Sequence, residues 1–100
     1  MPTRLTVDEA ALGRFCRRHR VSRLSLFGSA LKGLAGPDSD IDLLVEFEPG
    51  GEPGLIGIAA MEAELSALLP GRRIDLRTPQ DLSRYFRDEV MATAEVQYAR

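Results

Sequence analysis

The chain has 100 residues, of which 44% are hydrophobic and 28% charged, and this composition excludes a disordered protein. No apolar run approaches the roughly 18 residues that span a bilayer, and the opening segment "MPTRLTVDEA" lacks the apolar core of a signal peptide. The single cysteine, Cys16, excludes an internal disulfide and fits a reducing compartment. We therefore expect one domain over residues 1–100, located in the cytoplasm and not associated with a membrane.

The net charge of −2 is unevenly distributed along the chain. Residues 1–36 carry seven Lys or Arg and two acids, residues 37–70 carry eight acids and no base, and residues 71–100 carry six Arg and five acids. This asymmetry either creates a bipolar surface that steers a charged partner or reflects scattered solvated faces. The overall acidity argues against direct binding of nucleic acid.

A helix is predicted first, because Thr6 and Glu9 have the spacing of a capping box. It is expected to end near Arg20 or Val21. Its apolar residues recur at helical spacing and should share one buried face. This face holds the apolar residues Leu12, Phe15 and Cys16 and one histidine, His19.

Two strands are predicted next, separated by a short helix and a turn. The first strand covers residues 24–27 and stops at Gly28, residues 29–34 form the short helix, and Gly36-Pro37-Asp38 is the turn. The second strand begins near residue 41, because apolar and polar residues then alternate with a period of two. The alternating apolar residues are Ile41, Leu43, Val45 and Phe47.

The last third of the chain predicts a helix, a strand and a closing helix. Residues 55–69 are almost entirely apolar and predict a mostly buried helix, which Pro70-Gly71 ends. In the strand "RRIDLRT", Ile74 and Leu76 point to one side, and Arg73, Asp75 and Arg77 point to the other. A final helix is expected to start at Thr78-Pro79. Its predicted core residues are Leu82, Tyr85, Phe86, Val90, Met91 and Ala94. This order of elements predicts a small α/β sandwich.

Three carboxylates carry the chemistry that the sequence suggests. Asp40 and Asp42 lie two residues apart, so they share one face of their strand with Cα atoms about 6.6 Å apart. Asp75 joins them if its strand is a neighbour. Three ionised carboxylates in one site repel one another. A hard divalent cation relieves this repulsion, and Mg²⁺ is suited because it also binds substrate phosphates.

A phosphate site is predicted at Gly28-Ser29, directly after the first strand. Gly28 permits a sharp turn and a close approach of a ligand to the backbone. Ser29 opens the short helix, whose N–H groups and hydroxyl can hold phosphate oxygens. A phosphate site beside a carboxylate metal site indicates phosphoryl or nucleotidyl transfer, in which two metal ions stabilise the attacking and leaving oxygens.

The stretch "GSALKGLAGPDSDIDLLV" resembles the signature of the minimal nucleotidyltransferases, small members of the DNA polymerase β-like superfamily. The matching residues are Gly28, Ser29, Gly33, Pro37, Asp38, Ser39, Asp40, Asp42 and Leu43. The resemblance extends over the leading helix, the strand "RRIDLRTP" and a closing helix that ends near a Tyr. It implies an α/β (α+β) nucleotidyltransferase fold, in which a short mixed sheet is flanked by helices.

The resemblance also implies roles for single residues. Asp40 and Asp42 would bind Mg²⁺, with Asp75 as a third metal ligand or as the base that activates the attacking hydroxyl. Gly28, Ser29 and Ser39 would contact the nucleotide. The family often has Arg in the short helix, where this chain has Lys32, which either meets a phosphate as a point charge or is solvated.

Proteins of this type are typically antitoxins paired with a HEPN-type ribonuclease toxin that a neighbouring gene encodes. The resemblance therefore implies transfer of AMP from ATP to a hydroxyl of the toxin, with tyrosine as the expected acceptor, within a hetero-oligomer. Two alternatives stay open. One is an antitoxin that acts by binding alone, and the other is a nucleotidyltransferase that acts on a small molecule.

Overall fold

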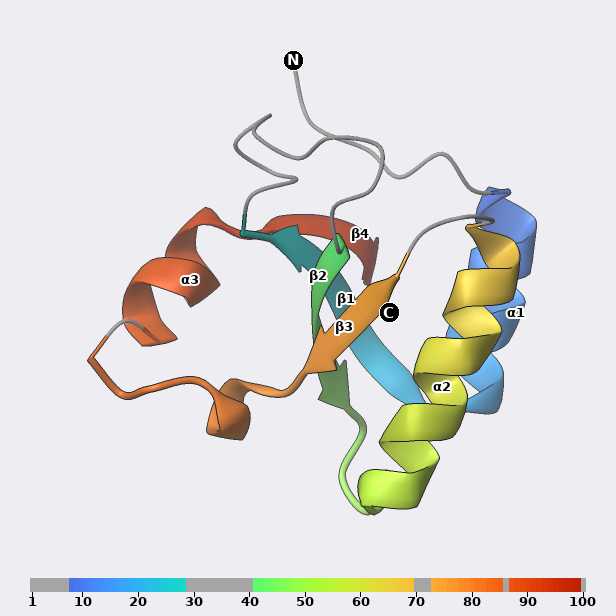
Figure 1. Ribbon diagram of the computed structural model, residues 1–100, viewed down its shortest axis with the longest axis horizontal. Helices are drawn as coiled ribbons and strands as arrows, with labels where there is room; N and C mark the ends of the chain where they lie inside the picture. Colours follow the sequence, from blue (N-terminus) through green and yellow to red (C-terminus); the bar gives the residue numbers. More distant parts are fainter. Residues whose placement is uncertain (1–7, 29–40, 70–72, 86, 100) are drawn as a thin grey trace.

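A four-stranded sheet forms the centre of the protein, with the strand order β3-β2-β1-β4 (Figure 1). The computed structural model describes residues 8–28, 41–69, 73–85 and 87–99. The elements within these ranges are α1 (Glu9–Arg18), β1 (Val21–Phe27), β2 (Ile41–Phe47), α2 (Leu55–Leu68), β3 (Ile74–Arg77), the 3-10 turn η1 (Pro79–Asp81), α3 (Arg87–Thr93) and β4 (Glu95–Ala99).

The sheet is mixed, as predicted. The central strand β1 pairs antiparallel with β2 and with β4, whereas β2 pairs parallel with β3. Parallel neighbours require a long crossover, and α2 supplies it between β2 and β3. The predicted fold class, a small α+β fold with a short sheet flanked by helices, is confirmed.

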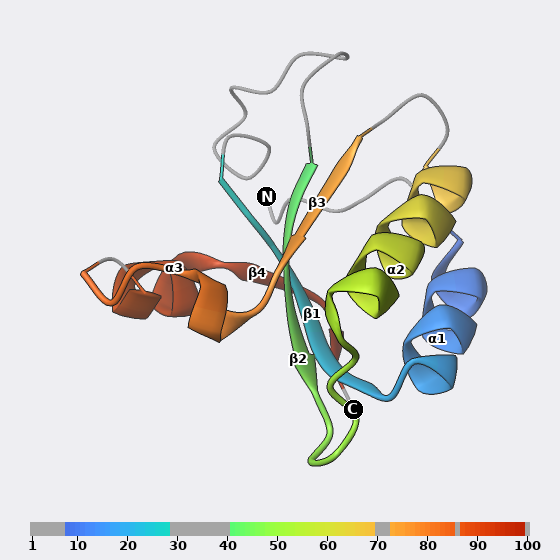
Figure 2. The ribbon, with the colours of Figure 1, turned by 60° about the horizontal axis from the view of Figure 1, so that its bottom comes forward.

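The hydrophobic core lies between one face of the sheet and the helices α1 and α2, which lie on the same side (Figure 2). The alternation of β2 produces this core, because Ile41, Leu43 and Val45 all point to the helices and are at most 3% exposed. The predicted apolar face of α1 is also confirmed. Its residues Leu12, Phe15 and Cys16 are all buried.

The opposite face of the sheet is covered more lightly, by the segment that contains η1 and α3 (Figure 2). Leu44 of β2 faces this side and is 1% exposed, and Leu82 after η1 is also buried. No residue of α3 is buried. This face therefore has only a small buried apolar centre.

The first helix is shorter at both ends than the sequence predicted. Its N-cap is Asp8 and not Thr6, because the Asp8 carboxylate accepts a hydrogen bond from the Ala10 N–H at 3.0 Å. The helix ends at Arg18, and β1 begins at Val21, three residues before the expected start. Arg20 explains the early strand, since its positive φ of 59° turns the chain directly from the helix into β1.

The helix predicted over 55–69 is confirmed as α2, but the expectation that it is mostly buried is wrong. Only Met61 and Leu65 are buried within it, and Leu55 and Ile56 are 89% and 87% exposed. Apolar residues occur on all sides of this helix, whereas the sheet covers one side of it.

In the part of the chain that the structure describes, every helix is too short or too polar to span a bilayer.

The closing helix predicted from Thr78 is also wrong. The Asp81 carboxylate accepts hydrogen bonds from the Thr78 N–H and hydroxyl at 3.1 Å, and this cap supports only the single turn η1. Leu82 then adopts an extended conformation and is buried, as predicted, but Tyr85 is 85% and Met91 37% exposed. The predicted core residues Val90 and Ala94 are half-buried, and Phe86 lies outside the described residues.

A fourth strand, β4, was not predicted. Its sequence "EVQYA" alternates apolar and polar residues, and it pairs with the edge of β1 that β2 leaves open. The register with β1 shifts between Leu24 and Ser25. Tyr98 therefore pairs with Leu24 and packs against the core, whereas Val96 pairs with Ser25 on the opposite face and is 52% exposed. The end of the chain therefore completes the sheet and not a helical layer.

Candidate active site

Two of the three predicted carboxylates are neighbours across the parallel strands. Asp42 of β2 and Asp75 of β3 are direct partners in the strand register, so both side chains point to the same face of the sheet. Ile41 and Leu43, on either side of Asp42, point into the core on the other face. Both aspartates are half-buried. The strand alternation thus places two carboxylates side by side, about 4.8 Å apart at their backbones, on the face away from α1 and α2.

Gly28 adjoins Asp42 at the end of β1. Phe27, the residue before it, is the register partner of Asp42. Gly28 has a φ of +78°, and a Cβ atom built there would lie 2.4 Å from Asp42 Oδ2. Both the left-handed backbone and the missing side chain are therefore required at this position. The carboxylate of Asp42 occupies the space that a side chain at position 28 would fill.

Asp75 forms an ion pair on its own strand. Arg77, two residues further along β3, donates hydrogen bonds from Nε and Nη2 to Asp75 Oδ2 at 3.3 and 3.2 Å. Both contacts fall on Oδ2, so Oδ1 takes no part in this ion pair. Arg77 thus offsets part of the negative charge that Asp42 and Asp75 concentrate.

Four of the predicted site residues lie outside the described residues: Ser29, Lys32, Ser39 and Asp40. The predicted convergence of Asp40 with the other carboxylates and the predicted phosphate site at Ser29 therefore stay predictions. Within the described ranges, no group of three His, Cys, Asp or Glu side chains forms a metal site.

The residues that are described fit a hard divalent cation. Two carboxylates side by side supply the oxygen ligands that Mg²⁺ prefers, and their mutual repulsion favours a counter-charge. Gly28 lets the carboxylate of Asp42 lie directly against the backbone at the end of β1.

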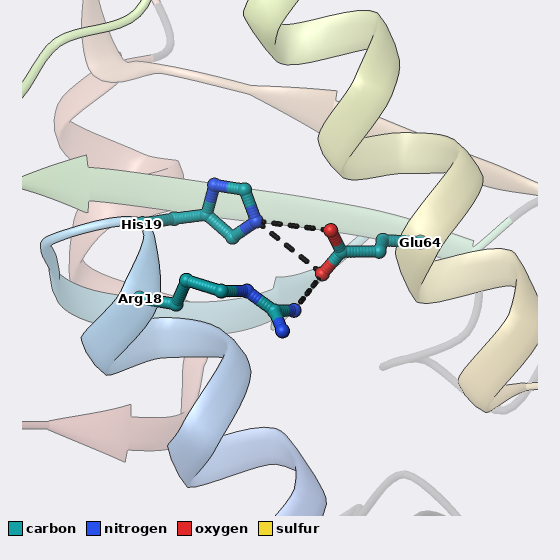
Figure 3. A network of polar contacts seen from close by, with 3 residues as sticks. All are labelled: Arg18, His19 and Glu64. Carbon is teal, nitrogen blue, oxygen red and sulfur yellow. Dashed lines mark hydrogen bonds and ion pairs between the residues drawn. The ribbon is translucent and has the colours of Figure 1, made fainter.

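Other reactive side chains of the chain lie in structural positions. Cys16 is fully buried, and its burial raises the thiol pKa to about 12, although nearby Arg17 acts in the opposite direction. His19 contacts Glu64 of α2, with His19 Nε2 3.3 Å from each carboxylate oxygen, and Arg18 pairs with the same carboxylate (Figure 3). These contacts tie the end of α1 to α2, as expected of a histidine on a helix face.

The sequence did not single out Glu62. Its Oε2 accepts a hydrogen bond from the Leu76 N–H at 2.7 Å, next to Asp75 in the chain. Glu62 and Leu76 are 14 positions apart and belong to different elements. No local pattern could have revealed this contact.

A profile of the nucleotidyltransferase domain matches residues 9–96. The chain belongs to the nucleotidyltransferase domain family. The resemblance that the sequence suggested is thereby confirmed. The chain is also 44% identical over 59 residues to the protein adenylyltransferase MntA of Thermococcus cleftensis, a match that covers 59% of this chain and 57% of that protein. The chain thus spans little more than half the length of this relative.

Solved structures share the fold of this nucleotidyltransferase domain. A structure provisionally named as a minimal nucleotidyltransferase has a TM-score of 0.70 and 37% identity, with 86% of this chain and 85% of that chain covered. A toxin–antitoxin crystal structure with AMP-PNP has a TM-score of 0.73 at 20% identity, covering 94% and 75%. A complex of a tri-AMPylated Shewanella oneidensis HEPN toxin with an MNT antitoxin has a TM-score of 0.64 at 19% identity, covering 92% and 70%. The last two show the fold alone.

Proposed function

We propose that this nucleotidyltransferase domain is an antitoxin that transfers AMP from ATP to a hydroxyl of a HEPN-type toxin and thereby neutralises it. The observation that carries the proposal is the pairing of Asp42 with Asp75 beside Gly28. The relative from Thermococcus is named a protein adenylyltransferase, and the structures of similar fold include a HEPN toxin that carries AMP. The tyrosine acceptor, the neighbouring gene and the cytoplasmic location belong to the same proposal.

The reaction needs few groups from the protein. The acceptor oxygen attacks the α-phosphorus of ATP, the bond from that phosphorus to the bridging oxygen breaks, and pyrophosphate leaves. Asp42, Asp75 and Asp40 would hold Mg²⁺, which when bound polarises the phosphoryl oxygens and offsets the charge of the leaving group. Gly28 and Ser29 would hold the triphosphate, and Lys32 and Ser39 would flank it.

Asp75 would also have one of two roles toward the acceptor hydroxyl, as a ligand of the cation or as the base that takes its proton. Arg77 holds Asp75 Oδ2 in place and leaves Oδ1 out of the ion pair. Oδ1 is therefore the atom proposed to bind the cation or to accept the proton of the attacking hydroxyl. The transfer requires the toxin to present that hydroxyl, which accounts for a hetero-oligomer.

The test is incubation of the chain with the product of its genomic neighbour, ATP labelled in the α-phosphate, and Mg²⁺. We expect label on the neighbour, no label with excess EDTA, and almost none with Asp42→Asn. ATP labelled in the γ-phosphate is the matched control and should leave the neighbour unlabelled, because the γ-phosphate leaves in pyrophosphate. Transfer that persists in EDTA would exclude the metal mechanism.

Neutralisation by binding alone is the second candidate. It is favoured by Leu55 and Ile56, two adjacent aliphatic side chains that are almost fully exposed and suited to a protein contact. Growth of cells that express the toxin separates the two candidates. Full protection by Asp42→Asn would favour contact alone, whereas loss of protection would favour transfer.

A further inference from the structure

The strand that carries Asp75 is the shortest strand of the sheet. β3 has four residues, lies at the edge and, among the residues that the structure describes, pairs with β2 on one side. The Ile41 N–H donates to the Arg73 C=O at 2.8 Å, so the backbone groups of residue 73 point toward β2. Because these directions alternate along a strand, Asp75 also points its backbone groups to β2, and Leu76 points its N–H to the open edge.

Glu62 occupies this open edge. The helix α2 runs alongside β3 in both views of the ribbon (Figures 1 and 2) and packs against it. From this helix, Glu62 Oε2 accepts the hydrogen bond of the Leu76 N–H at 2.7 Å in a partly buried position. A hydrogen bond to an ionised carboxylate is stronger than one between neutral groups. The Glu62 side chain therefore provides a hydrogen-bond acceptor on the outer side of β3, where a neighbouring strand would provide one inside a sheet.

The contact between Glu62 and Leu76 matters because it lies next to the register pair Asp42–Asp75. Two like charges on neighbouring strands repel each other, and the part of this repulsion that Arg77 does not offset acts to move the short edge strand away from β2. Glu62 holds β3 from the other side, one residue after Asp75. We propose that Glu62 is a positioning residue, which keeps Asp75 beside Asp42 by anchoring β3 to α2. This inference rests on the proposed function, because it assigns Asp75 its place in that site.

Two variants of nearly equal size separate the hydrogen bond from packing. Glu62→Gln keeps a carbonyl oxygen that can accept the Leu76 N–H, whereas Glu62→Met fills the space with a thioether that is only a weak acceptor. Glu64→Met is the matched control. It removes a glutamate two residues away on α2 whose contacts go to Arg18 of α1 and to His19, which follows that helix, and not to β3 (Figure 3).

The first measurement is amide hydrogen exchange of the full chain by NMR, without metal or nucleotide. We expect the Leu76 N–H to be protected in the wild type and in Glu62→Gln. In Glu62→Met it should exchange about tenfold faster or more, as the loss of one hydrogen bond to a charged group implies. Glu64→Met should leave Leu76 unchanged. Should Glu62→Met not fold, a Leu76 N–H that exchanges in the wild type as fast as in a free peptide would overturn the inference.

The second measurement uses Mn²⁺ as a paramagnetic probe of the metal site. Mn²⁺ should broaden the amide signals of both Asp42 and Asp75 in the wild type. In Glu62→Met the broadening at Asp75 should weaken relative to that at Asp42, and Glu62→Gln should restore it. Equal broadening of the two signals in Glu62→Met would contradict a positioning role.

Transfer activity completes the test. We expect kcat to fall about tenfold to a hundredfold in Glu62→Met, the effect of a small misplacement of a reacting group, with KM for ATP little changed and with recovery in Glu62→Gln. An equal loss in Glu64→Met would mean that any weakening of α2 has this effect, and would overturn the inference. Absence of transfer in the wild type would instead contradict the proposed function, and amide exchange would still decide whether Glu62 anchors β3.

Discussion

The two faces of the sheet differ in what they contribute to the protein. On the helix face, Leu24, Leu43, Val45 and Leu76 are all at most 4% exposed and pack under α1 and α2. On the other face, Asp42 and Asp75 are half-buried and lie next to an ion-paired arginine. Burial of apolar surface on the first face supplies stability, and this allows the second face to hold like charges together at a cost.

The polar face is not uniform. Leu44 and Ser25 are register partners near its middle and are at most 3% exposed, because the segment with η1 packs there. Asp42 lies two residues before Leu44, near the start of β2 and opposite the end of β1. The candidate chemistry is therefore confined to the end of the sheet where Gly28 turns the chain, and apolar packing continues behind it. Adjacent residues of β2 should consequently respond to mutation in opposite ways.

The largest effect is expected for Asp42→Asn, which removes a charge at nearly constant volume. Transfer should fall about a hundredfold to a thousandfold, equivalent to roughly 2.7–4 kcal/mol, as is typical when a group that stabilises the transition state is lost. The free energy of unfolding without ligand should stay equal or rise, because the repulsion with Asp75 is relieved. Initial rates and urea unfolding measure the two effects separately.

Ligand binding provides the control for that variant. Mg²⁺ with ATP at about ten times Kd should stabilise the wild type by roughly 1.4 kcal/mol, which is about 6–11 °C in Tm for a domain of this size. Most of this shift should disappear in Asp42→Asn. A less stable Asn variant, together with a wild type that shows no shift, would contradict the metal-site interpretation of these carboxylates.

Leu43→Ala changes the next residue and should act on the other face. Leu43 is 0% exposed, so truncation leaves a cavity in the core and should cost about 2–5 kcal/mol of unfolding free energy. The rate of transfer per folded molecule should change little, since the side chain points away from Asp42. Urea unfolding and activity at a temperature where the variant is folded check both statements. A large drop in transfer with unchanged stability would mean that the two faces are not separate.

Gly28→Ala should lower both the free energy of unfolding and the rate of transfer. The loss of stability should be smaller than that of Leu43→Ala. The left-handed backbone costs about 1–2 kcal/mol for a residue with a side chain. The new Cβ would also displace the Asp42 carboxylate, which lies 2.4 Å from that point, so transfer should fall markedly. Thermal melts and initial rates are the measurements. Gly50→Ala is a matched control, because Gly50 has a φ of +80° but nothing within 4 Å of the added Cβ, so it should cost stability without loss of transfer.

The sequence predicted the part of the fold that local patterns encode. The alternation from Ile41 to Phe47 fixed β2 and its buried face, and "RRIDLRT" fixed β3. The end of the chain was misread because Leu82, Phe86 and Val90 recur every four residues, as on one face of a helix, although a cap at Thr78 supports one turn only. The strand β4 depends on the free edge of β1, a partner more than 60 residues away that no local pattern shows.

The candidate site shows the same division. The motif indicated Gly28 and Asp42 as site residues. The sequence placed Asp75 beside Asp42 on the condition that their strands are neighbours, and this condition holds. The contact of Arg77 with Asp75 was within reach, because alternation puts the two side chains on one face. Glu62 was not, since its role depends on how a helix packs against a sheet edge.

The smallest effect concerns Cys16, which reports on the packing of the helix face. Burial raises the pKa of its thiol from 9.0 to about 12, so the folded state favours the protonated form. Below pH 9 this costs nothing. As the pH rises from 9 toward 12, the unfolded chain loses the thiol proton first, and unfolding becomes easier. At pH 10 the loss of unfolding free energy due to Cys16 should be about 1 kcal/mol. Cys16→Ala lacks this titration but keeps every other group, so its unfolding free energy should fall less between pH 8 and pH 10 than that of the wild type. Urea unfolding of both proteins at the two pH values gives the comparison, and equal changes would show that the core beneath α1 admits water to the thiol.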